Sequence, residues 1–166
     1  MIAGLEPWAG QAISAGSALA IGALVGLERG FKLRAQKDGR RVAGIRTFTL
    51  MGLGSGIAGL LSAAQPLAAG VIVAAMLGYL AIAYAPRLKA KGDATSPIAA
   101  ATTVALAFLA GTGTIGLALA GTAVVVLILA MKDEVHEFVG RLDEKDVHAL
   151  ARYAIIALAV LPFLPD

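Results

Sequence analysis

The densest polar chemistry of this sequence lies in residues 21–56, where one apolar stretch ends and the next begins. Glu28 and Arg29 close the first stretch, and Arg46 and Thr47 open the second. A carboxylate at the edge of a low-dielectric layer is costly without a cationic partner, so we expect Glu28 to pair with Arg46 or with Arg29. Two roles remain open: a clamp that fixes the first helical hairpin, or a cation ligand or proton acceptor at a pore mouth that Arg46 gates and Thr47 helps to orient.

A second polar cluster, Asp133, His136 and Glu137, has the i, i+3, i+4 spacing that places three side chains on one face of a helix. Oxygen and imidazole ligands of this kind hold divalent cations, and Glu28 is a further candidate ligand. A solvated face of a surface helix accounts for the same three residues, and we favour that interpretation. The sequence offers no nucleophile–base pair, phosphate-binding loop or zinc signature, so we expect neither enzymatic activity nor a resident cofactor.

The elements that position these residues are transmembrane helices. Of 166 residues, 58% are hydrophobic and 15% are charged, whereas soluble domains average about 45–50% and about 25%. We predict an all-α, polytopic transmembrane helix bundle that forms one domain over residues 1–166. Six apolar stretches are long enough to span a bilayer or nearly so: residues 8–27, 47–64, 66–84 (ended by Pro86), 96–110, 115–131 and 147–164.

Two boundaries of this prediction rest on local patterns. The apolar run Pro97–Met131 is too long for one span, so we expect it to break at Gly111–Thr114. Residues 132–142 place apolar side chains at i, i+3, i+4 and i+7, which predicts a short amphipathic helix at the membrane interface. Asp143, with Asp146 three residues later, is the expected N-cap of the last span.

Small residues recur at four-residue spacing on the first three spans. Such faces let helix backbones approach closely, either within one subunit or between two, and packing within the subunit is the default expectation. A homo-oligomer is the expected assembly, since a small bundle needs a partner to build a pathway. The small-residue positions are Gly22, Gly26 and Gly30 on the first span, Gly52 and Gly56 on the second, and Gly70, Ala74 and Gly78 on the third.

Charge placement predicts the orientation in the membrane. All 14 Lys and Arg residues fall in or around three connections on one side of the predicted bundle. By the positive-inside rule these connections are cytoplasmic, so both termini lie outside the bacterial inner membrane.

The N-terminal residues lack the basic region of a cleaved signal peptide, so we expect the first apolar stretch to be retained. The basic pI needs no nucleic-acid partner, and the absence of cysteine excludes a disulfide framework.

Two segments resemble a known family. GALVGLERG (Gly22–Gly30) followed by AGIRTFTLMGLGSG (Ala43–Gly56) is similar to the opening of the MgtC/SapB family of bacterial membrane proteins, whose first helix ends in Gly-Leu-Glu-Arg and whose second begins with Gly-x-Arg-Thr. Leu129–Asp166 looks like the junction in a longer branch, in which a second membrane domain follows. The matching residues are Gly26, Glu28, Arg29, Gly44, Arg46 and Thr47.

The resemblance implies a link to growth in low magnesium. Compact members continue into a soluble domain and the longer branch into further spans, whereas this chain stops at Asp166, as a natural short form or an N-terminal fragment would. We expect a channel or transporter-like protein of ion homeostasis, with Mg²⁺ as substrate or ligand. The alternative is a non-conducting regulator that binds the helices of another membrane complex.

One structural feature separates the two functions. A conduction path requires polar side chains of the first, second and fourth spans to converge on one hydrated surface, whereas a regulator needs a small-residue face directed at lipid. The polar candidates are Gln11, Ser14, Ser17, Ser55, Thr102 and Thr103. Serine and threonine also bond to carbonyl groups of their own helix, so their residue type alone does not decide.

Overall fold

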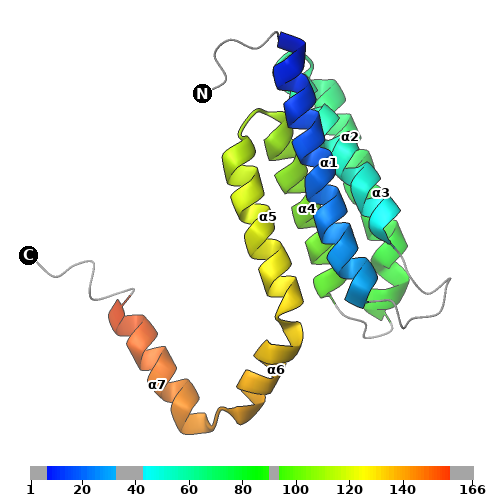
Figure 1. Cartoon of the computed structure of the whole chain (residues 1–166). Helices are drawn as coiled ribbons and strands as arrows, with labels where there is room; N and C mark the ends of the chain where they lie inside the picture. Colours follow the sequence, from blue (N-terminus) through cyan, green and yellow to red (C-terminus); the bar gives the residue numbers. More distant parts are fainter. Residues whose placement is uncertain (1–6, 33–42, 90–93, 158–166) are drawn as a thin grey trace, which may run out of the picture. The chain divides into compact units, whose positions relative to one another are not determined.

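Seven α-helices, and no strand, make up residues 7–32, 43–89 and 94–157, the part of the chain that a computed structural model describes (Figure 1). The expected all-α class is confirmed. The chain divides into two compact units at Leu129 and Ala130. The first unit contains α1 (Pro7–Lys32), α2 (Ile45–Leu61), α3 (Pro66–Lys89), α4 (Thr95–Gly111) and nearly all of α5 (Ile115–Ala130), and the second contains α6 (Lys132–Arg141) and α7 (Glu144–Ile155).

Five of these helices are apolar. Two segments, Trp8–Lys32 of α1 and Pro66–Pro86 of α3, are long and apolar enough to cross a membrane by themselves, and α2, α4 and α5 are shorter apolar helices. The described part of α7 is amphipathic instead, because Lys145, His148 and Arg152 interrupt it. The rest of the expected span 147–164, from residue 158 on, lies outside the described residues. A count of six spans therefore stays a prediction.

α1 continues past Leu27, where the sequence pattern predicted the span to end, and stops only at Lys32. Arg29 and Lys32 lie in its last turn, where cations interact favourably with the unpaired carbonyl groups of a helix end. Glu28 and Arg29 are consequently helical residues and not part of a loop. α3 likewise continues past Pro86 to Lys89, since a proline in the last turn of a helix removes only one backbone hydrogen bond.

Close backbone contact joins α1 to α2. A Cβ atom added to Gly26 would lie 2.8 Å from Cβ of Phe48 and 2.9 Å from Cα of Ile45. One added to Gly52 would lie 3.0 Å from Cα of Gly22, and one added to Gly22 would overlap the carbonyl group of Phe48. The GxxxG faces of α1 and α2 thus face each other, as packing within one subunit predicts.

α4 completes this arrangement by lying against both α1 and α2, and the four helices α1–α4 run side by side (Figure 1). A Cβ atom added to Gly59 of α2 would lie 2.8 Å from Cα of Gly111 on α4. Apolar residues fill the space around these contacts. The fully buried members with the largest side chains are Ile21 and Val25 of α1, Phe48 of α2 and Val104 of α4.

α3 and α5 pack more loosely on this three-helix core. Ser55 of α2 donates a hydrogen bond to Sδ of Met76 on α3, at 3.3 Å. α5 buries only Ala118, Thr122 and Leu129. Most of its leucine, isoleucine and valine side chains are exposed in the isolated chain, as expected for side chains that lipid covers.

The turn between α4 and α5 occupies the expected residues, Gly111–Thr114. Gly113 has a φ angle of +92°, a conformation that strains any residue with a Cβ atom. The amide of Gly113 donates to the carbonyl oxygen of Ala110 at 3.0 Å, and the hydroxyl of Thr112 donates to that of Leu109 at 2.8 Å. These bonds satisfy the end of α4 and let the chain reverse within one short turn.

The second unit consists of two short amphipathic helices. α6 ends at Arg141, and Asp143 then caps α7 as predicted: its Oδ1 accepts from the amide of Asp146 at 2.8 Å, and the side chain of Asp146 accepts from the amide of Asp143 at 3.1 Å. This reciprocal pair is a capping box, which fixes the start of α7 at Glu144.

The glycine contacts predict a difference between two substitutions on one helix. Gly26→Ala should lower the free energy of unfolding by about 1–3 kcal/mol, because the added methyl group overpacks the contact with Phe48 and Ile45. Gly16→Ala is the matched control, since no atom lies within 4 Å of its added Cβ. It should leave stability unchanged or raise it by about 0.5–1 kcal/mol through helix propensity. Unfolding by sodium dodecyl sulfate in mixed micelles measures both, and equal stabilities would contradict the described packing.

Candidate functional site

The candidate site is an ion pair between two neighbouring residues near the end of α1. Nε of Arg29 donates a hydrogen bond to Oε2 of Glu28 at 2.7 Å. Successive residues of a helix point about 100° apart, so the Arg29 side chain must bend towards Glu28, and it reaches the carboxylate through Nε, the guanidinium nitrogen nearest its stem. Both side chains are nearly buried, with exposed fractions of 10% for Glu28 and 5% for Arg29.

The second carboxylate oxygen of Glu28 is not satisfied in the same way. Oε1 is buried, and no hydrogen-bond donor reaches it among the residues that the structure describes. A buried charged acceptor without a partner is expensive, so this atom is the place where a cation or an additional donor would gain most. The guanidinium group on Oε2 works against a cation, since it already neutralises the carboxylate and repels a second positive charge.

Arg46 and Thr47 take no part in this pair. Both lie in the first turn of α2, where Arg46 is exposed and Thr47 is half-buried. Within the described residues the structure gives Arg46 no ion pair. Of the two cations that the sequence left open as partners of Glu28, the geometry places Arg29 on the carboxylate.

The polar side chains of the bundle bond mainly to their own helices. The hydroxyl of Thr103 donates to the carbonyl oxygen of Ala99 at 2.7 Å, and that of Thr102 donates to Ile98 at 2.9 Å. Ser55 contacts Met76, Ser14 is buried, and Gln11 is exposed. The donor protons of Thr102 and Thr103 are thus directed along α4 and not towards a neighbouring helix.

The small-residue faces divide into a closed set and an open set. Gly22, Gly26, Gly52 and Gly56 are buried in the contacts of α1 and α2, whereas an added Cβ at Gly30 would meet no atom within 4 Å. On α3, the stripe of Gly70, Ala74 and Gly78 is exposed throughout.

An apolar groove adjoins this stripe between α3 and α4. It has a volume of about 630 Å³ and is lined almost entirely by carbon atoms. The sequence pattern identified the small residues of α3 but not the α4 residues that line the other wall of the groove. The spacing of those α4 residues indicates a binding surface only when the two helices are placed together. The lining residues are Ser62, Pro66, Ala69, Gly70, Val73, Ala74 and Leu77 with Ala101, Val104, Ala105 and Phe108 of α4.

The candidate metal cluster of α6 is only partly described. The side chains of Asp133 and His136 lie outside the described part of the structure, and Glu137 forms an exposed ion pair with Arg141 one turn later. Among the side chains that are described, no group of three or more histidine, aspartate or glutamate residues could hold a metal ion.

Comparison with known families agrees with this architecture. The sequence profile of the MgtC family matches residues 16–138, which run from within α1 to within α6 and include the Glu28–Arg29 pair. The chain therefore belongs to the MgtC family, whose members are membrane-associated proteins linked to magnesium homeostasis. Comparison with curated proteins gave no match, and neither did comparison with solved structures.

The ion pair predicts unequal effects for the two arginines. Arg29→Met leaves the Glu28 carboxylate buried without its partner and should lower the free energy of unfolding by about 3–5 kcal/mol. Arg46→Met removes an exposed charge and should change it by no more than about 0.5 kcal/mol. Adding Glu28→Gln to Arg29→Met should restore part of the loss, as a double-mutant cycle in mixed micelles would measure. A larger loss from Arg46→Met would show that Glu28 depends on α2 instead.

Proposed function

We propose that this protein is a non-conducting regulator of magnesium homeostasis that binds a transmembrane helix of another membrane protein in its α3–α4 groove. The observation that carries the proposal is the groove itself, an apolar hollow of about 630 Å³ beside the exposed stripe Gly70, Ala74 and Gly78. It is a helix-packing surface that the described helices leave open.

The composition of the groove favours a helix as its occupant. Inside a bilayer, helices associate through close van der Waals packing, because lipid is as apolar as the side chains it would displace. Gly70 and Ala74 on one wall, and Ala101 and Ala105 on the other, keep the backbones of both walls accessible. A partner helix with larger apolar side chains can enter the space between them.

The remaining geometry fits a regulator better than a channel. The glycine faces of α1 and α2 are closed against each other, and the hydroxyl donors of α4 bond to their own helix. The Glu28 carboxylate is held by Arg29. A single chain with these contacts offers no described polar surface along which an ion would cross.

The membrane setting is part of the same proposal. We place the protein in the bacterial inner membrane with its basic connections in the cytoplasm and its N-terminus outside, because its Lys and Arg residues segregate to one side of the predicted bundle. We further propose that the protein is a homo-oligomer without enzymatic activity or a resident cofactor. Its proposed partners are the lipid bilayer and a second membrane protein.

A substitution inside the groove tests the proposal. Ala74→Leu should weaken partner binding by about 1–3 kcal/mol, roughly 5- to 150-fold in affinity, because the added side chain occupies the groove. Ala75→Leu is the matched control, since Ala75 is exposed on the same helix and does not line the groove. The measurement is growth in magnesium-limited medium of a bacterial strain that depends on the protein, with membrane levels checked by immunoblot.

A photo-crosslinker at Leu77, which lines the groove, identifies the occupant. We expect a crosslinked adduct whose mass exceeds that of the chain by the mass of a different membrane protein. This adduct should be lost in Ala74→Leu and kept in Ala75→Leu. Normal growth and an unchanged adduct in Ala74→Leu would contradict the proposal. An adduct of twice the chain's mass would show that the groove joins two copies of this protein.

A second candidate function, ion movement past Glu28, is favoured by the Oε1 atom of Glu28, which no donor of the described residues reaches. If subunits meet at this end of α1, several such carboxylates would concentrate cations at the cytoplasmic mouth of a shared path. Liposomes that contain the purified protein should then conduct magnesium, potassium or protons, and Glu28→Gln should lower the flux at least tenfold, by about 1.4 kcal/mol of lost cation attraction. Our primary proposal expects no flux for any of these ions.

A further inference from the structure

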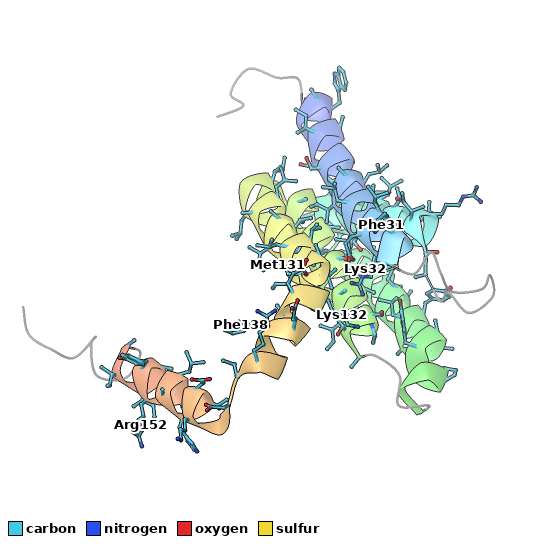
Figure 2. All side chains as sticks on the ribbon, turned by 60° about the horizontal axis from the view of Figure 1, so that its bottom comes forward. Phe31, Lys32, Met131, Lys132, Phe138 and Arg152 are labelled. Atoms are coloured by element: carbon cyan, nitrogen blue, oxygen red, sulfur yellow. The ribbon has the colours of Figure 1, made fainter. Side chains whose placement is uncertain are left out.

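α7 carries a basic face that neither proposed function uses. Lys145, His148 and Arg152 stand at i, i+3 and i+7, so they lie along one side of the helix. With Ala149 they line a shallow cleft of about 320 Å³. Figure 2 shows Arg152 on α7, with its long side chain projecting from the helix.

The opposite face of α7 is apolar. Its apolar residues recur at the helical spacing of three or four residues, which places them on the side away from Lys145. They are Val147, Leu150, Ala151 and Ala154. Val147 and Leu150 are 52% and 54% exposed.

Local bonds keep α7 helical at its start. The capping box of Asp143 and Asp146 satisfies two amide groups that the first turn would otherwise leave without partners. The two faces are therefore held in a fixed angular relation. A helix with an apolar side and a side that carries cations, here Lys145 and Arg152, resembles helices that lie in the membrane interface and attract anionic lipids.

We propose that α7 lies on the membrane surface, in place of the first part of the span that the sequence predicted for residues 147–164, and that its basic cleft binds the phosphate of an anionic phospholipid headgroup. The apolar face enters the boundary between headgroups and acyl chains. Lys145 and Arg152 have long stems that let their charged ends reach the phosphate layer while the helix stays partly immersed. The charge of the cleft complements an anionic lipid and not a zwitterionic one, and Ala149 leaves space between the cations for the phosphate oxygens.

The chain contains no cysteine, so Ala154→Cys introduces a unique labelling site on the apolar face. The experiment uses the full chain with an environment-sensitive dye at this position, in nanodiscs of phosphatidylcholine with increasing fractions of phosphatidylglycerol. We expect the emission to shift to the blue, and quenching by iodide to fall, as phosphatidylglycerol is added. Raising the salt concentration should reverse part of the change, because exposed charges are screened.

The variant Lys145→Gln with Arg152→Gln removes two charges from the cleft. Each cation near an anionic surface contributes roughly 5-fold, so the ratio of shielded to exposed dye should fall on the order of 30-fold. The matched control, Arg46→Gln with Arg141→Gln, removes two charges from exposed positions elsewhere and should keep the response of the parent. All four residues are exposed, so we expect both variants to fold.

Three results would overturn the proposal. A parent protein that ignores phosphatidylglycerol would show that α7 does not bind the anionic surface. An equal loss in the control variant would show that overall charge, and not the cleft, governs the response. A full response to inorganic phosphate in nanodiscs of phosphatidylcholine alone would assign the cleft to free phosphate. None of these results bears on the α3–α4 groove, which lies in the other unit of the chain.

Discussion

The structure depends first on the close approach of α1 and α2. Gly22, Gly26 and Gly52 carry no Cβ atom, so the backbones of the two helices come within contact distance and their side chains interlock around Phe48. Helices inside a bilayer gain little by leaving lipid, so they must gain from contacts of this kind. α4 then lies against both helices, and Gly59 and Gly111 allow a similarly close backbone contact between α2 and α4.

The Glu28–Arg29 pair is a consequence of how α1 ends. Because the helix continues to Lys32, the carboxylate and the guanidinium belong to the same rigid element and bury together near its end. Their attraction offsets the desolvation of two charges only in part, and the compensation is incomplete at Oε1, which no donor of the described residues reaches. A site of this kind can serve as a clamp in one chain and as a cation-attracting group where several chains meet.

The outer surfaces of the helices differ in the kind of contact that they can make with lipid or with another protein. Lipid can cover the exposed leucine and valine side chains of α5, but α3 presents Gly70, Ala74 and Gly78, which lipid packs against poorly. The groove beside them and the two-faced α7 are therefore different kinds of surface: the first suits a helix inside the bilayer, and the second suits its charged boundary.

Local sequence patterns were enough to predict the helical class, the reversal at Gly111–Thr114, the cap at Asp143 and, through GLERG and GIRT, the MgtC family. These features depend on local propensity, on hydropathy and on short motifs, all of which act within a few residues. Only the tertiary structure placed Arg29 rather than Arg46 on Glu28, closed one set of glycines and left the stripe of α3 open beside α4. Spacing along the chain states which residues share a face, but only packing decides which face meets which, because that choice depends on contacts between segments far apart in the sequence.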